Sequence, residues 1–191
     1  MILKNIFDYI LALILLIFLV GLIVLLIIIS SLDTNEFGLF TQTRVGKNGR
    51  FFKIYKIRTI NGISKSTITT NQHQITKIGK FLRDYKLDEL PQLFNILKGE
   101  MSFVGPRPDV TGYADKLLGE DRIMLKVKPG ITGPAQLKYR NEEEVLSNVN
   151  DPIKYNDEII WPDKVKTNVE YVKNWSFQQD LLYMFQTIFK K

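Results

Sequence analysis

Apolar residues form one uninterrupted run near the N-terminus of the chain. Positions 9–32 carry no charged side chain, and Tyr9, Ser30 and Ser31 are the polar residues among them. As a helix, the run would rise about 36 Å, against about 30 Å of hydrocarbon in a bilayer. A secretory signal is a poor alternative, because the apolar region is too long and no A-x-A cleavage site follows it. The pattern therefore predicts a membrane-inserted helix over residues 1–33.

Two short segments, residues 40–44 and 51–60, flank the glycine-bounded turn at residues 46–49 and predict a β-hairpin. In the second strand, Lys56 and Arg58 lie two positions apart and should share one face. Residues 61–74 are rich in Ser, Thr, Asn and Gln, which predicts a mobile loop.

Helical spacing of apolar residues predicts helices in four later segments. These are residues 75–85, 88–98, 110–127 and 176–190. Asp88 is expected to cap the second helix, with Pro91 in its first turn and Gly99 after its end. Ser176 and Gln179 form a capping box for the last helix, whose apolar stripe would pack on a core or lie in the membrane interface.

Two proline-bounded stretches interrupt these helices, and we expect an extended loop at residues 103–108 and a rigid turn at 129–134. The elements together predict a helix-dominated α+β fold. It would consist of the membrane-inserted helix over residues 1–33 and one cytoplasmic domain over residues 34–191. The domain would contain the short β-hairpin and interfacial amphipathic helices.

The charge distribution agrees with a membrane-bound domain. The net charge is +6, and the basic excess lies after the apolar run. Such a domain suits lipid headgroups, phosphates or nucleic acid, and positive charge beside a membrane segment stays on the cytoplasmic side. The chain has no cysteine, which excludes disulfides, cysteine nucleophiles and thiolate metal sites. The single histidine, His73, cannot form a usual zinc site and is best interpreted as a solvated loop residue.

The remaining candidate catalytic and binding residues are carboxylates and cations, and the adjacent pair Asp88-Glu89 is the leading candidate among them. Successive helical residues point about 100° apart, so one carboxylate could attack a phosphorus atom while the other binds a metal or takes a proton. Capping of a helix would also explain the pair fully.

Five cations lie in the surrounding motifs: Lys56, Arg58, Arg83, Arg107 and Arg140. A diphosphate substrate needs several cations held in fixed geometry, and arginine binds phosphate with two parallel hydrogen bonds. A solvated surface charge is the default for each of them. Arg107 stands out, because prolines on both sides would restrict it. No aromatic and basic pattern typical of a nucleic-acid surface is present.

The stretch KLDELPQLFNILKGEMSFVGPRP resembles the bacterial sugar transferases, the monotopic phosphoglycosyl transferases that begin lipid-linked glycan assembly. Three further stretches agree with the same family: FTQTRVGKNGRFFKIYKIRT, KVKPGITGPAQLKYRNE and YVKNWSFQQDL. The opening KNIFDYILALILL also looks like the membrane segment of that family. The resemblance runs from about residue 4 to residue 186.

The resemblance implies a reaction in two steps. Asp88 would attack the β-phosphate of a UDP-sugar and release UMP. A polyprenyl phosphate, such as undecaprenyl phosphate, would then attack the aspartyl ester and leave as a polyprenyl diphosphate sugar. Glu89 would activate the lipid phosphate or help Asp88 to hold Mg²⁺.

The resemblance also implies where substrates bind. Arg83, Arg107 and Arg140 match family positions associated with phosphate and nucleotide binding, and Lys56 matches a lysine of the motif. We expect Arg58 to bind substrate beside them. The implied partners are a UDP-sugar, a polyprenyl phosphate and membrane lipids, without nucleic acid, and a homodimer is left open. The implied location is the bacterial inner membrane, with the catalytic domain on its cytoplasmic face.

The sequence departs from the family pattern in two places. The family usually carries Ser-Pro in the middle of the membrane helix, which turns the chain back to the cytoplasmic side, and this chain has Val20-Gly21 there. The family thus implies a re-entrant helix, whereas glycine, which weakens a helix by only about 1 kcal/mol, favours a simple span. Pro134 and Tyr139 also replace the Trp and Gly found in many members.

Two alternatives to covalent catalysis are open at this point. The chain could be a non-enzymatic membrane-tethered adaptor whose basic face binds anionic lipid. It could also be a one-step transferase that uses Glu89 as a base, without a covalent intermediate.

Overall fold

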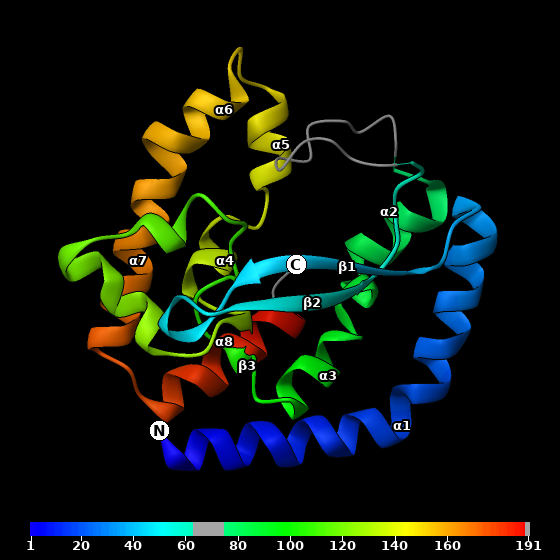
Figure 1. The fold of residues 1–191 in the computed structure, drawn as a ribbon, viewed down its shortest axis with the longest axis horizontal. Helices are drawn as coiled ribbons and strands as arrows, with labels where there is room; N and C mark the ends of the chain where they lie inside the picture. Colours follow the sequence, from blue (N-terminus) through cyan, green and yellow to red (C-terminus); the bar gives the residue numbers. More distant parts are fainter. Residues whose placement is uncertain (63–74, 190–191) are drawn as a thin grey trace. The chain divides into compact units, whose positions relative to one another are not determined.

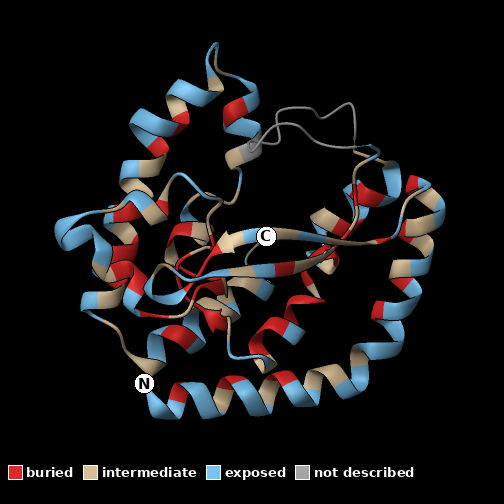
Figure 2. Ribbon diagram, viewed as in Figure 1, coloured by how far each residue is buried: buried red, intermediate tan, exposed pale blue. Residues whose placement is uncertain are grey.

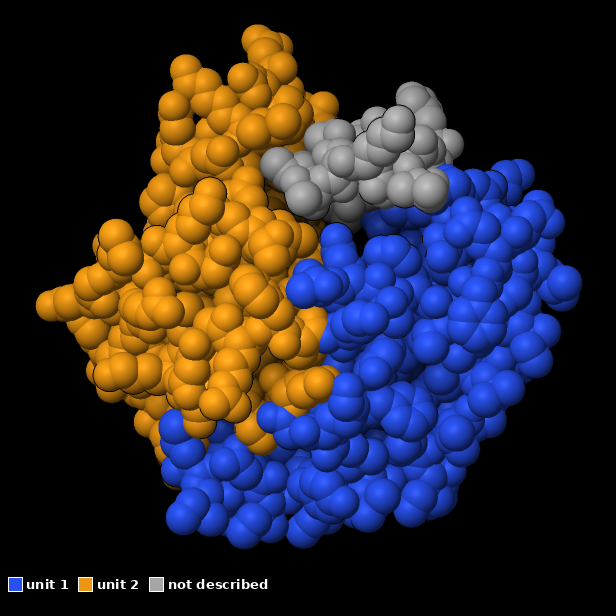
Figure 3. All heavy atoms as spheres, in the orientation of Figure 1, with its two compact units in different colours: residues 1–43, 53–99 blue, residues 44–52, 100–191 orange. Residues whose placement is uncertain are grey.

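The computed structural model describes residues 1–62 and 75–189. The predicted loop at residues 61–74 therefore lies almost wholly outside the described residues, as does His73. The chain forms two compact units, coloured separately in Figure 3. Unit 1 comprises residues 1–43 and 53–99, and unit 2 comprises residues 44–52 and 100–191.

Unit 1 begins with α1 (Ile2–Thr34), a single helix through the apolar run. Figure 1 shows that this helix changes direction part-way along its length. Many large apolar side chains along it are exposed, and Figure 2 shows the pale-blue positions that result. By length and composition, α1 is able to cross a membrane, as predicted. Its re-entrant insertion stays a prediction.

The C-terminal part of α1 is tied to the rest of unit 1. Leu26 packs with Ile57 and Leu82 in a buried cluster, which we call the unit 1 core. Ser30 Oγ also donates a hydrogen bond of 2.6 Å to the carbonyl oxygen of Arg58. This part of α1 thus belongs to the same packed body as the elements that follow it.

The predicted hairpin is confirmed. Strand β1 (Leu39–Val45) pairs with β2 (Phe51–Ile57), and the short 3-10 turn η1 (Lys47–Gly49) joins them. Strand β2 ends three residues earlier than expected. An isolated bridge between Ile60 and Ile75 follows it.

The predicted helix at residues 75–85 is confirmed as α2 (Lys77–Asp84), which begins after the Thr76 cap. The next prediction is wrong in its first half. Asp88 does not cap a helix, because it lies in the 3-10 turn η3 (Leu87–Glu89), and α3 (Gln92–Leu97) begins after Pro91. Gly99, with a φ of 75°, follows the end of α3 as expected.

Unit 2 contains a small parallel sheet that the sequence did not indicate. Strand β3 (Ser102–Val104) pairs with β4 (Gly130–Thr132), with Ser102 opposite Gly130 and Val104 opposite Thr132. The expected loop at residues 103–108 therefore begins inside a strand, and the expected turn at 129–134 contains one. A Cβ on Gly130 would overlap the backbone of Gly105, so this close approach requires glycine.

The helix expected over residues 110–127 is also wrong. The segment forms two 3-10 stretches, η4 (Ala114–Lys116) and η5 (Gly119–Lys126). Gly112 and Gly119 have φ values of 103° and 58°, which an α-helix does not contain. The apolar residues of the segment still reach the core. The unit 2 core consists of Val45, Ala114, Met124, Leu125, Val165 and Val169.

The remainder of unit 2 is helical. Its elements are α4 (Pro134–Lys138), α5 (Glu142–Ser147), α6 (Pro152–Tyr155), the π-helical turn η6 (Asn156–Ile160), α7 (Trp161–Lys173) and α8 (Phe177–Phe189). The Ser176 half of the predicted capping box of α8 is confirmed, since Ser176 Oγ accepts a hydrogen bond of 3.2 Å from the backbone N–H of Gln179. The buried Asp180 joins α7 to α8 by accepting hydrogen bonds from Tyr171 and Trp175. Interfacial placement of α8 stays a prediction.

Two glycines of unit 1 should respond in opposite ways to alanine. In Gly79→Ala the new methyl group would overlap the carbonyl oxygen of Thr59, and overpacking costs about 1–3 kcal/mol. In Gly21→Ala it would meet no atom within 4 Å, and alanine is favoured in a helix by about 1 kcal/mol. Thermal unfolding in detergent should show Tm lowered by the first change and unchanged or raised by the second. A Gly79→Ala variant as stable as the parent would contradict this packing.

Candidate active site

Asp88 and Glu89 are buried, with 6% and 8% of their surfaces exposed. They lie in η3, which begins after Lys86 turns the chain with a left-handed φ of 57°. Leu87 and Leu90 flank the pair and pack against the unit 1 core. The apolar neighbours therefore draw the two carboxylates out of water.

Lys56, on β2, is the partner of Glu89. Its Nζ lies 2.9 Å from Glu89 Oε1, and the ion pair is largely removed from solvent. The attraction between the two charges is stronger than in a surface ion pair, because less water screens it. Lys56 therefore offsets one of the two negative charges that η3 buries.

Asp88 differs from Glu89 in having an oxygen without a partner. Its Oδ1 is buried, and no described residue donates a hydrogen bond to it. A capping aspartate would accept a backbone N–H, so the capping interpretation does not explain this residue. Leaving a buried acceptor unsatisfied costs about 1–3 kcal/mol. Such an oxygen in a native site calls for a role, such as binding a metal ion or reacting.

Electrostatics at Asp88 are set by opposing effects. Burial is the largest and raises the pKa of Asp88 above its ordinary value. Lys56 lowers it, Glu89 raises it, and Arg83 and Lys86 lower it. The result is a raised pKa and a poorly solvated carboxylate, surrounded by three cations that favour its charged form.

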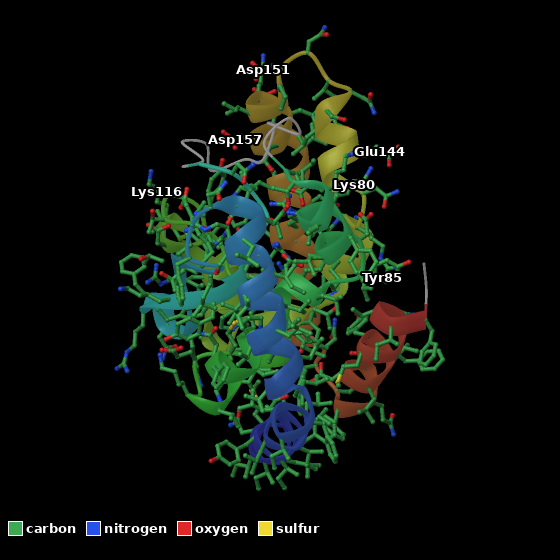
Figure 4. All side chains as sticks on the ribbon, turned by 90° about the vertical axis from the view of Figure 1, so that its right-hand side faces the viewer. Lys80, Tyr85, Lys116, Glu144, Asp151 and Asp157 are labelled. Atoms are coloured by element: carbon green, nitrogen blue, oxygen red, sulfur yellow. The ribbon has the colours of Figure 1, made fainter. Side chains whose placement is uncertain are left out.

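Arg83 is held near Asp88 by the chain just after β2. Its Nε donates a hydrogen bond of 3.0 Å to Oγ1 of the buried Thr59. Lys80 on α2 and Tyr85 just after it are exposed instead, as the labels in Figure 4 show. Arg83 is half-buried next to the buried Leu82, and its positive charge lowers the pKa of Asp88, so the structure brings Arg83 together with the carboxylates.

Arg58 has different partners. Its Nη1 lies 2.9 Å from Glu36 Oε2, its Nε donates to the carbonyl oxygen of Phe37, and its guanidinium packs over Phe40. These contacts join it to the chain just before and within β1. Substrate binding by Arg58 stays a prediction.

Arg107 and Arg140 belong to unit 2. Arg140 Nη2 donates a hydrogen bond of 3.0 Å to the carbonyl oxygen of Gln186, in the last turn of α8, where carbonyl groups lack helical partners. Arg107 is half-buried between Pro106 and Pro108. Phosphate binding by both arginines stays a prediction.

Asp109 is a candidate residue that sequence reasoning missed. Although part of its surface is exposed, burial of its carboxyl group raises the pKa to about 6, while Lys164, Arg44 and Arg107 lower it and Glu142 raises it. Its position directly after Arg107-Pro108 was the available signal. Its other neighbours, Lys164, Arg44 and Glu142, could not have been foreseen, because they come from distant parts of the chain.

A magnesium ion would find two carboxylates at this site and few other protein ligands. Within residues 1–62 and 75–189, no three His, Cys, Asp or Glu side chains gather closely enough to hold a metal. Mg²⁺ usually keeps several waters and binds one or two carboxylates together with substrate phosphates. The unpartnered Oδ1 of Asp88 fits that mode of binding.

Comparison with known proteins gives one family. The family model described as bacterial sugar transferase matches residues 1–191. The uncharacterized sugar transferase EpsL of Bacillus subtilis is 36% identical over 100% of this chain and 87% of its own. The UDP-glucose:undecaprenyl-phosphate glucose-1-phosphate transferase of Escherichia coli is 33% identical over 98% of this chain and 40% of its own.

A third relative is the undecaprenyl-phosphate galactose phosphotransferase of Salmonella typhimurium, which is 32% identical over 97% of this chain. The chain spans 39% of that protein's length. It therefore matches nearly all of EpsL but well under half of the two relatives whose names state a reaction.

The strain at Asp88 predicts a change in stability. Because the pKa is raised in the folded state, the folded protein loses stability as pH rises from about 3.8 through that raised value. Asp88→Asn removes the buried charge and should raise Tm at pH 7 by a few degrees, since 1 kcal/mol corresponds to about 2–4 °C. The difference from the parent should disappear below about pH 3.8 in thermal scans.

Asp163→Asn is the matched control. Hydrogen bonds from Lys138 and Tyr139 lower the pKa of Asp163, so its charge stabilises the folded state at neutral pH. This variant should lower Tm at pH 7. An equal fall in both variants would show that Asp88 carries no strain.

Proposed function

The chain belongs to the bacterial sugar transferase family, and we propose that it transfers a sugar 1-phosphate from a UDP-sugar to undecaprenyl phosphate. The names of the relatives support the donor and the acceptor. The observation that carries the mechanism is the buried Asp88, whose Oδ1 lacks a partner while Glu89 beside it is paired with Lys56.

The first step is attack by the Asp88 carboxylate on the β-phosphorus of the UDP-sugar. A new P–O bond forms to the aspartate, and the bond from that phosphorus to the bridging oxygen breaks, so that UMP leaves. No proton has to be removed from the nucleophile, because a carboxylate is ionised at neutral pH unless its pKa is raised very far. Burial favours the attack as well, since a poorly solvated carboxylate has less water to lose.

The cations around Asp88 make this approach electrostatically feasible. A diphosphate and a carboxylate repel each other, and Lys56 and Arg83 supply positive charge where they meet. Lys56 also offsets Glu89, so that η3 does not present two uncompensated charges to the substrate. Both cations are held in place before substrate arrives, one by Glu89 and the other by Thr59.

The second step restores Asp88. An oxygen of undecaprenyl phosphate attacks the phosphorus of the aspartyl phospho-sugar, and the Asp88 carboxylate leaves. Glu89 would take a proton from a monoprotonated acceptor phosphate. Magnesium, held by Asp88 and Glu89 together with substrate oxygens, would neutralise charge on the phosphates.

The covalent intermediate suits the location that we propose. UMP can leave toward the cytoplasm before the lipid acceptor reaches the site from the bilayer. Helix α1 anchors the protein in the inner membrane, and the basic excess of the chain favours the cytoplasmic face.

The buried site favours this mechanism over the alternatives. An adaptor that binds lipid through surface cations would gain nothing from burying an unpartnered Asp88 oxygen. A one-step reaction would need only Glu89 to activate the acceptor, and it would leave the buried, unpartnered oxygen of Asp88 without a role. Asp88 is therefore the better nucleophile, and Glu89 the better second-step assistant.

Asp88→Asn should abolish UMP release from a UDP-sugar in the presence of undecaprenyl phosphate. An amide oxygen is a much poorer nucleophile than a carboxylate, so we expect a loss of at least about 10⁴-fold in kcat. A panel of UDP-sugars, with UMP measured by a coupled assay, provides the measurement. Asp84→Asn, on the exposed end of α2, is the control and should keep full activity.

The covalent step has its own test. With UDP-sugar and no acceptor, mass spectrometry should find the parent protein heavier by one sugar phosphate, and Asp88→Asn unmodified. An active Asp88→Asn variant would overturn the nucleophile. An active parent without any adduct would instead favour the one-step reaction.

Removal of divalent cations should stop UMP release. EDTA is expected to abolish activity in purified protein, and excess Mg²⁺ should restore it, because the metal would neutralise negative charge on the substrate phosphates during the transfer. Asp84→Asn should respond like the parent. Full activity after exhaustive chelation would contradict a magnesium requirement.

A further inference from the structure

Asn95 is fully buried on α3, with 0% of its surface exposed, and its side chain binds the backbone of β2. Oδ1 accepts a hydrogen bond of 3.1 Å from the N–H of Tyr55. Nδ2 donates a hydrogen bond of 2.7 Å to the carbonyl oxygen of Lys53. One amide side chain therefore satisfies two backbone groups of a neighbouring strand.

These two groups lie on the edge of β2 that faces away from β1. Just beyond β2, the N–H of Arg58 donates to the carbonyl oxygen of Gly38, just before β1. Backbone groups alternate between the two edges of a strand, so those of Lys53 and Tyr55 point to the opposite edge. Asn95 thus makes the pair of hydrogen bonds that a third strand would make.

We call the two hydrogen bonds from Asn95 to the backbone of β2 the Asn95 clamp. This clamp joins the two elements that carry the candidate active site, the strand with Lys56 and the segment that follows Glu89. Lys56 directly follows Tyr55 on β2, and Glu89 lies one short turn before α3 in the chain. Asn95 fixes β2 against α3, and Lys56 Nζ and Glu89 Oε1 meet at 2.9 Å across the same junction. A shift between β2 and α3 would change that distance directly.

Packing alone does not explain an asparagine at this position. Leu93 and Ile96 on the same helix are buried apolar residues that supply packing. An amide adds direction, because both of its hydrogen bonds must be aligned to form. Lys98 also contacts the Tyr55 ring and hydroxyl group, so contact between α3 and β2 does not depend on Asn95 alone.

We propose that Asn95 is a positioning residue for the transfer reaction, which fixes β2 against α3 so that Lys56 stays beside Glu89 and Asp88. The proposal rests on the proposed function, since it assigns Asn95 a part in that reaction. Asn95 itself touches no substrate. It acts through Lys56.

A double-mutant cycle separates this role from a general effect on folding. Asn95→Leu keeps the branched shape and the number of side-chain heavy atoms and removes both hydrogen bonds, and it should lower kcat for UMP release by about 10–100-fold, as small misplacements of catalytic groups do. Lys56→Met should lower kcat at least as much. If Asn95 acts through Lys56, the double variant should be no slower than Lys56→Met alone. If the loss of kcat in the double variant equals the product of the losses in the two single variants, the proposal is overturned.

Asn168→Leu is the matched control, because Asn168 is a buried asparagine of unit 2. Its effect on kcat, whatever its size, should multiply with that of Lys56→Met. Coupling as strong as that of Asn95 would show that any core asparagine produces the pattern, and the proposal would fail.

Hydrogen exchange gives a measurement that does not depend on activity. The Tyr55 amide should be protected in the parent and exchange at least about tenfold faster in Asn95→Leu, with the Tyr55 amide unchanged in Asn168→Leu. If Asn95→Leu does not fold, the smaller Asn95→Ala also removes the acceptor for the Tyr55 amide and can replace it in this experiment. Equal exchange in parent and variant would overturn the clamp, whereas a parent without UMP release would overturn the proposed function alone.

Discussion

The ion pair between Lys56 and Glu89 is the interaction on which the site depends. Two adjacent carboxylates in one short turn cannot both be buried as charges without a compensating cation nearby. Lys56 lies 2.9 Å from Glu89 and also lowers the pKa of Asp88, so it serves both. The ion pair therefore requires strand β2 and the turn η3 to keep their relative positions.

Unit 1 stabilises a site that is unfavourable in itself. The buried Oδ1 of Asp88 has no partner among the described residues, and the pKa of its carboxyl group is raised. The cost is offset around it by a core on which Leu87 and Leu90 pack, and by directed hydrogen bonds such as that of Arg83 to Thr59. Local strain of this kind persists where the surroundings fix it.

Local sequence rules succeeded where a single element decides the outcome. The hairpin, α2 and the Ser176 cap follow from periodicity and turn chemistry, and the structure has all three. The rules failed at η3, where they assigned Asp88 to a helix cap, because capping chemistry and a 3-10 turn use the same residue types. They also missed β3 with β4, whose pairing joins residues far apart in the chain.

Contacts between residues far apart in the chain were also what the sequence could not predict at the candidate active site. The carboxylates and cations were named as candidates from their types and from the family motifs, but their partners were not visible in the sequence. Pairing Lys56 with Glu89 requires β2 to lie beside η3, and the tertiary structure alone determines that arrangement.

The packing of unit 1 also has a consequence for the lipid acceptor. Leu26 of α1 is part of the unit 1 core and Leu87 beside Asp88 packs against it, so the proposed membrane anchor and the proposed nucleophile belong to one packed body. A lipid phosphate held at the bilayer surface would then meet Asp88 at a height that this core sets.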